Sequence, residues 1–197
     1  MFNTYEITHL NGCRFLVGNA EGKAWYDPIN PFAKLEYEWV LDNVEIKGKR
    51  VVDAGAHHGH YTLVFKDAAE IICFEPVAGN VQILKHNLNA NGIKAIVKCN
   101  MIGHGNLPVY APNMDIVKMD IEGSEFASLP HAIDEMATVS VWIVEIHPKR
   151  GNPEIITNAF IKKGFELLYV NRQTMAVEPY LPGTVWKSHA TVIARKP

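Results

Sequence analysis

The sequence predicts an α/β fold in which helices cover both faces of a mainly parallel sheet. Short apolar runs without polar alternation, such as residues 71–74 and 141–146, indicate strands that are buried on both faces. Segments with apolar residues three and four positions apart separate these runs and indicate amphipathic helices. This alternation is typical of a parallel sheet, and 197 residues suit one such domain with a short appended element.

The N-terminal region (1–47) predicts a small β/α extension that packs on the core. Residues 5–29 hold short apolar pieces separated by glycines, which indicate small strands or a hairpin. Asn30 and Pro31 form a typical helix start, an N-cap followed by proline. The next apolar residues keep helical spacing and predict a helix over 31–44: Phe32, Leu35, Trp39 and Val40. We expect the rest of the chain (48–197) to form the main domain.

The main domain alternates strands and helices along its length. Its seven predicted strands cover residues 51–52, 71–74, 95–97, 116–119, 141–146, 165–170 and 191–194. Its predicted helices cover residues 59–67, a segment from Val77 to a C-cap glycine at Gly92, and a segment from Asn152-Pro153 to Gly164. In such folds ligands bind at the carboxyl ends of the strands, so the loops that follow them are the candidate site.

Composition excludes several classes of protein. The 19 basic and 21 acidic residues give a net charge of −2, without the basic excess of a dedicated nucleic-acid binder. No stretch approaches the roughly 20 apolar residues of a membrane helix, and residues 1–6 are too polar for a signal peptide. Three widely spaced cysteines (Cys13, Cys73 and Cys99) predict buried strand thiols in a reduced, cytoplasmic protein.

The loop after the first main-domain strand runs from Asp53 to Gly59. Its glycines accept unusual backbone angles and let a ligand approach the main chain, while Asp53 can accept hydrogen bonds from a ligand or order the loop. An ordinary strand-to-helix turn remains the alternative. The loop is not the G-x-G-x-x-G fingerprint, because His57 stands where the middle glycine would fall, which argues against NAD or FAD.

Glu75 ends the second main-domain strand, 20 residues after Gly55. A carboxylate has two acceptor oxygens, which match the two hydroxyls of a ribose. Alternatively, Glu75 is a helix N-cap directly before Pro76, and the two roles are compatible.

Asp53, Gly55, Gly59 and Glu75, in this spacing, resemble class I S-adenosylmethionine-dependent methyltransferases. Two later segments resemble the FkbM type within that class. One is Asp-Ile-Glu-Gly-Ser-Glu over residues 120–125, and the other is Glu-Ile-His over residues 145–147. The resemblance covers roughly residues 48–170, and the His57-His58 pair departs from it.

The resemblance implies a Rossmann-like, doubly wound sheet of seven strands, mainly parallel, with an antiparallel last strand. It also implies S-adenosylmethionine as the cofactor. The residues expected to bind this cofactor are Asp53, Gly55, His57, Gly59, Glu75, Asn100, Met101 and Asp120. For the adenine we expect a hydrogen bond from Asn100 or a neighbouring main-chain amide, and packing from Met101 or Ile102.

His147, Glu122 and Asp120 are the expected catalytic residues, one of which would take the proton of a hydroxyl acceptor. Each also has a structural interpretation: Glu122 and Glu125 suit the start of a helix, and His147 and Asp120 suit a loop. The three expected catalytic residues offer oxygen and imidazole ligands for Mg²⁺ or Mn²⁺. No metal is expected, however.

The sequence therefore predicts an O-methyltransferase that acts on a small hydroxylated molecule or sugar, with no membrane partner. A nucleic-acid methyltransferase is the first alternative, but the pI near 6.5 and the lack of an Asn-Pro-Pro-Tyr-like segment argue against it. The second alternative is a module that binds the cofactor without turnover, and intact Glu122 and His147 argue against that.

Overall fold

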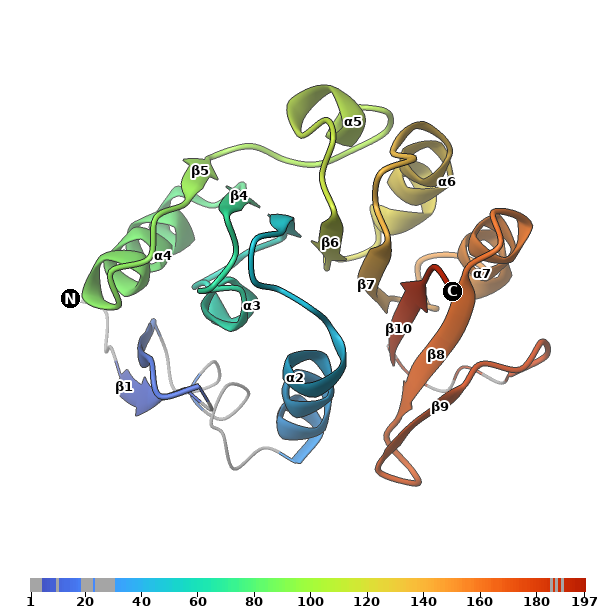
Figure 1. Cartoon of the computed structure of the whole chain (residues 1–197), viewed down its shortest axis with the longest axis horizontal. Helices are drawn as coiled ribbons and strands as arrows, with labels where there is room; N and C mark the ends of the chain where they lie inside the picture. Colours follow the sequence, from blue (N-terminus) through green and yellow to red (C-terminus); the bar gives the residue numbers. More distant parts are fainter. Residues whose placement is uncertain are drawn as a thin grey trace.

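The computed structural model describes residues 5–9, 11–18, 23, 31–184, 186, 188 and 190–197 (Figure 1). The strands are β1 (Tyr5–Thr8), β2 (Arg14–Val17), β3 (Arg50–Ala54), β4 (Glu70–Phe74), β5 (Ile96–Lys98), β6 (Ile116–Met119), β7 (Val141–Ile146), β8 (Glu166–Asn171), β9 (Ala176–Pro179) and β10 (Ala190–Arg195). The helices are α2 (Pro31–Asn43), α3 (His60–Val64), α4 (Ala78–Ala90), α5 (Leu107–Tyr110), α6 (Glu125–Glu135) and α7 (Pro153–Lys162).

The main sheet has the strand order β5-β4-β3-β6-β7-β10-β8-β9. Strands β3 to β7 pair in parallel, and β10 lies antiparallel to both β7 and β8. The predicted mainly parallel sheet with an antiparallel last strand is thus confirmed. The eighth strand, β9, was missed because its four residues lie at the sheet edge, partly exposed, and form no continuous apolar run.

Two apolar cores lie on opposite faces of the sheet. Neighbouring residues of one strand point to different cores: Val51 packs towards α2, α3 and α4, whereas Val52 packs towards α5, α6 and α7. Figure 1 shows these two helix groups with the sheet between them. Trp142, which is fully buried, anchors the second core against Phe160 of α7. The prediction of helices on both faces is confirmed.

The β1–β2 hairpin is a separate antiparallel pair that lies against α4. Asn87 of α4 bonds both the amide and the carbonyl of Leu16, at 2.7 and 2.9 Å. Asn91, one turn later, bonds the amide and the carbonyl of Arg14 in the same way, at 2.8 and 2.6 Å. Two asparagine side chains thus replace a neighbouring strand for β2. The predicted N-cap at Asn30 lies outside the described residues.

The helix bounds and the burial of the cysteines agree only in part with the sequence predictions. Helices α2, α4 and α7 match their predicted ranges to within two residues, whereas α3 is shorter than predicted. Helix α5 was missed, and for α6 only a possible start at Glu122 or Glu125 was expected. Cys13 and Cys73 are buried as expected, but Cys99 is exposed just beyond β5, so the prediction of a buried thiol there was wrong. Within the described part of the chain, no helix has the length and apolar character needed to cross a membrane.

Candidate functional site

Every predicted site residue lies at the carboxyl edge of the parallel strands. Strand β3 stands at the switch point of the sheet, because the chain passes from β3 to β4 on one side and later returns to β6 on the other. Loops on the two sides of such a point diverge and leave a crevice for a ligand. Five strands and the loops after them supply the predicted site residues: Asp53, Gly55, His57 and Gly59 from β3 and its loop, Glu75 after β4, Asn100 and Met101 after β5, Asp120 and Glu122 after β6, and His147 after β7.

Close packing explains the two glycines of the β3–α3 loop. Gly55 has φ +77°, and a Cβ there would lie 1.7 Å from the main-chain oxygen of Asp120. Gly59 has φ +92°, and a Cβ there would lie 2.5 Å from Leu84 of α4. Both positions therefore exclude other residues for reasons within the protein. His57, between them, also has a positive φ of 48°. The tight turn predicted from the sequence is present.

Glu75 is buried and joins two elements of the site. One carboxylate oxygen, Oε2, accepts a hydrogen bond from the amide of His57 at 2.9 Å. The other, Oε1, accepts from the amide of Val77 at 2.9 Å and from Asn80 at 3.1 Å. The N-cap of α4 is Val77, not Glu75, so the predicted capping position was wrong; Glu75 instead bonds the amide of that N-cap residue. Each carboxylate oxygen offers about two acceptor sites, so Oε2 keeps one for a ligand hydroxyl.

A buried lysine, Lys118 of β6, was missed by the sequence analysis. Its Nζ donates to the carbonyl of Gly55 at 3.1 Å and lies 3.5 Å from Oδ1 of Asp53 and 4.0 Å from Oδ2 of Asp120. Burial alone would lower the pKa of Lys118, but the surrounding carboxylates, Asp53 first, outweigh burial and raise it. A lysine within the apolar run 116–119 was the available signal.

Asp53 is fully buried and takes a 2.6 Å hydrogen bond from Thr62 of α3 in addition to the Lys118 contact. It therefore fastens α3 to β3 and orders the loop between them. This is the loop-ordering role that the sequence left open beside ligand binding.

The residues after β5 differ in how far a ligand can reach them. Met101 is 64% exposed, whereas Ile102 is 2% exposed and belongs to the apolar core. Of the two residues expected to pack on adenine, only Met101 is therefore accessible. The main-chain amide of Asn100 already donates to Lys98 at 2.9 Å. The side chain of Asn100 is exposed.

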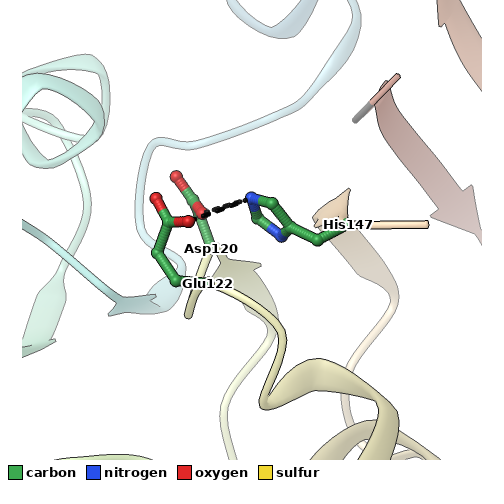
Figure 2. A group of neighbouring side chains, drawn as sticks. All are labelled: Asp120, Glu122 and His147. Carbon is green, nitrogen blue, oxygen red and sulfur yellow. Dashed lines mark ion pairs between the residues drawn. The ribbon is translucent and has the colours of Figure 1, made fainter. Parts of the chain in front are cut away.

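The loops after β6 and β7 bring the three expected catalytic residues together. Figure 2 shows Asp120 and Glu122 facing the imidazole of His147. The Nε2 atom of His147 lies 3.5 Å from Oε2 of Glu122 and 3.9 Å from Oδ1 of Asp120. The Asp120 and His147 side chains are largely buried, at 27% and 15% exposure, whereas that of Glu122 is 83% exposed.

Glu125, the first residue of α6, fixes the orientation of His147. This fully buried carboxylate accepts hydrogen bonds from the main-chain amide and the Nδ1 atom of His147, at 2.9 and 2.8 Å. It also accepts from the amide of Gly123 at 2.6 Å. The hydrogen bond to Glu125 raises the pKa of His147 to about 9, against the opposing effect of burial. Near neutral pH the imidazole is therefore charged in the free protein.

Helix α2 adds a carboxylate, Glu36, that the sequence analysis did not select. Tyr61 donates to one oxygen of Glu36, and Thr191 of β10 donates to the other at 2.8 Å. Thr191 is the cross-strand partner of Glu145 on β7. Burial, together with the charges of Asp120 and Glu36, raises the pKa of Glu145 to about 8. The extension thus contributes to the electrostatics of the site.

Comparison with known proteins supports the fold. No protein-family model matches the sequence, and no curated protein sequence matches it. Among solved structures, a SAM-dependent methyltransferase from Agrobacterium tumefaciens superposes with a TM-score of 0.67 at 14% identity, covering 100% of this chain and 71% of that one.

Two further structures have similar scores. An rRNA methylase from Streptococcus thermophilus gives a TM-score of 0.58 at 12% identity, covering 82% of this chain and 94% of that one. A SAM-dependent O-methyltransferase from Thermotoga maritima gives 0.57 at 12% identity, covering 98% and 92%. At these identities the likeness establishes a Rossmann-like fold shared with methyltransferases.

Proposed function

We propose that this protein is a methyltransferase of the FkbM type that transfers the methyl group of S-adenosylmethionine to a hydroxyl of a small molecule or sugar. One observation carries the proposal: the residues expected for the cofactor and those expected for catalysis converge on one edge of the sheet, around the switch point at β3. The shared fold of SAM-dependent methyltransferases supports it.

The residues proposed to hold the cofactor are Asp53, Gly55, His57, Gly59, Glu75, Asn100, Met101 and Asp120. They suit its chemistry. Glu75 keeps acceptor capacity for ribose hydroxyls, and the exposed Met101 and Asn100 follow the neighbouring strand, where adenine would pack. Asp120 supplies negative charge, which favours a sulfonium. When bound, the cofactor supplies a methyl group activated by that sulfonium.

His147, Glu122 and Asp120 are proposed to act on the acceptor. The bond that the acceptor oxygen would form to the methyl carbon would replace the sulfur–carbon bond of the cofactor, and the electron pair of that bond would stay on sulfur. The hydroxyl proton must leave as well, and one of these three side chains would take it. Because the pKa of His147 is raised to about 9, the two carboxylates are the first candidates near neutral pH.

A nucleic-acid acceptor is the competing proposal, and the likeness to an rRNA methylase is the observation in its favour. The net charge of −2 favours the small-molecule acceptor, because backbone phosphates are held mainly by basic residues. A cofactor-binding module without turnover is the other alternative.

The test combines calorimetry with a labelled-methyl assay. We expect S-adenosylmethionine and S-adenosylhomocysteine to bind and NAD not to bind. Methyl transfer is then measured on a panel of hydroxylated metabolites and sugars, with rRNA as the comparison acceptor. Binding of NAD in place of S-adenosylhomocysteine would overturn the cofactor. Transfer to rRNA alone would overturn the acceptor class, and binding without transfer to any acceptor would favour the module without turnover.

A further inference from the structure

Asp120, Glu122 and His147 bring three potential metal ligands together, with one atom from each lying within 4.8 Å of the others. We propose that these residues bind a divalent cation of the Mn²⁺ or Mg²⁺ class, although the sequence analysis expected no metal here. Two carboxylates and one imidazole form a mixed oxygen and nitrogen set, which suits these cations. On binding, the Nε2 atom of His147 would release its proton to solvent, since a histidine ligand binds a metal in its neutral form.

The distances fit one octahedral ion. With bonds of about 2.1 Å, neighbouring ligand atoms lie about 3.0 Å apart and opposite ones about 4.2 Å apart. The Nε2 atom of His147 lies 3.5 Å from Glu122 and 3.9 Å from Asp120, close to this range. Shifts of less than about 1 Å would complete the three bonds. All three side chains point inward to a common centre in Figure 2.

The surroundings of His147 match those of a metal-binding histidine. Such a histidine usually donates its other ring nitrogen to a carboxylate, which fixes the ring and its tautomer. Glu125, fully buried, holds the Nδ1 atom of His147 at 2.8 Å and so directs Nε2 toward Asp120 and Glu122. This contact is a separate observation from Asp120 and Glu122, because Glu125 bonds the Nδ1 atom of the ring and the other two carboxylates lie near Nε2.

Asp120 supplies a further independent observation. Its two oxygens face different groups: Oδ2 lies 4.0 Å from Lys118, whereas Oδ1 faces His147. Within the described residues, Oδ1 is buried and accepts no hydrogen bond. A buried carboxylate oxygen without a donor costs free energy that a cation would recover.

The exposed Glu122 leaves the proposed centre open to solvent, so a bound cation would keep coordination positions for water or an acceptor oxygen. If the proposed methyl transfer is correct, a hydroxyl on the cation would lose its proton to solvent more readily. The three residues would then serve as ligands, and the cation would replace a side-chain base. This consequence rests on the proposed function, whereas cation binding itself does not.

The test uses Mn²⁺ alone, without cofactor or acceptor. Calorimetry and electron paramagnetic resonance should show one bound Mn²⁺ per chain that Mg²⁺ displaces. Asp120→Asn, His147→Ala and Glu122→Gln should each weaken binding by more than tenfold. Glu122→Gln changes an exposed side chain and so keeps the fold. Glu125→Gln should weaken binding by about tenfold through the histidine. Asp134→Asn, an exposed carboxylate paired with Lys163, is the control and should bind as the wild type does.

The proposal fails if the wild type does not bind Mn²⁺ at millimolar concentration, or if Glu122→Gln and Asp120→Asn bind it as tightly as the wild type. Its failure is distinct from failure of the methyl-transfer proposal. Transfer that keeps its full rate in a chelator, with no Mn²⁺ binding, would overturn the cation site alone. Mn²⁺ binding in a chain that does not bind S-adenosylmethionine would overturn the methyl transfer alone.

Discussion

At the scale of single residues, Lys118 forms a buried ion pair with Asp53 beneath the site. Its side chain is 8% exposed, and its ammonium lies 3.5 Å from Asp53, which is fully buried. Burying two charges is costly, and their attraction offsets that cost only when further hydrogen bonds satisfy them. Thr62 donates to one oxygen of Asp53, Lys118 lies 3.5 Å from the other, and Lys118 also donates to the carbonyl of Gly55. The pair therefore holds β3, α3 and β6 in a fixed arrangement.

We expect Lys118→Met to destabilise the fold by roughly 3–5 kcal/mol, because it leaves the Asp53 charge buried without a cation. The combined variant Lys118→Met, Asp53→Asn should lose less than the sum of the two single changes. Urea denaturation measures all three. Lys163→Met removes an exposed lysine that pairs with Asp134 and should change little. Additive losses in the combined variant would show that the two charges are not coupled.

The sequence predicted the ends of seven strands to within two residues, because apolar runs mark the buried strands. It did not reveal what those residues contact. Gly55 is required by a carbonyl of the neighbouring loop, and Glu75 bonds the amides of both His57 and Val77. Such roles depend on partners brought close only by the fold, and no local pattern marks them.

At the scale of elements, two sets of contacts hold the N-terminal hairpin. One is with α4, and the other is made by His9, between the two strands. His9, which follows β1, is 2% exposed and packs against the rings of Tyr37 on α2 and His60 on α3. Burial is the main cause that lowers the pKa of His9 to about 4, despite a hydrogen bond to Asn11 that raises it. Protonating His9 therefore opposes the packing of the hairpin.

This predicts a pH dependence of stability. The folded chain binds the His9 proton only near pH 4, whereas the unfolded chain binds it near 6.5. The unfolded state thus holds more protons between these values, and stability falls as pH drops from about 6.5 to about 4. Urea denaturation across this window should show a shallower pH dependence for His9→Gln. His86→Gln, at an exposed position of α4, should keep the wild-type slope. Equal slopes in all three proteins would contradict the prediction.

At the scale of the whole molecule, the sequence predicted the core strands, but it did not predict the contact that joins α2 to β10 beside the site. Apolar runs predicted seven strands of the main sheet. The edge strand β9 and the four-residue helix α5 have no comparable pattern in their sequences. The bond from Thr191 to Glu36 joins residues 155 positions apart and links α2 to β10. Helical spacing predicted α2, yet nothing in its sequence indicated that Glu36 would reach the neighbourhood of Glu145.

The carboxylate of Glu36 links the extension to the site. Glu36 accepts hydrogen bonds from Tyr61 and Thr191, and its charge contributes to the raised pKa of Glu145. Glu145 lies two residues before His147, which we propose to act on the acceptor. Glu36→Gln keeps the size of the side chain but offers one acceptor oxygen where two are needed. We therefore expect kcat/KM for the acceptor to fall by about tenfold, equivalent to about 1.4 kcal/mol, with binding of S-adenosylhomocysteine unchanged.

Calorimetry with S-adenosylhomocysteine and a methyl-transfer assay on the same preparation separate the two effects of Glu36→Gln. Glu38→Gln, an exposed change on the same helix at a residue paired with Lys34, is the matched control and should leave both quantities at wild-type values. Because Glu36 contacts α3 and β10, its loss should act through the placement of α2 near the residues that we propose to act on the acceptor. If Glu36→Gln weakens cofactor binding and leaves acceptor turnover intact, α2 belongs to the cofactor side, and the extension has a different role.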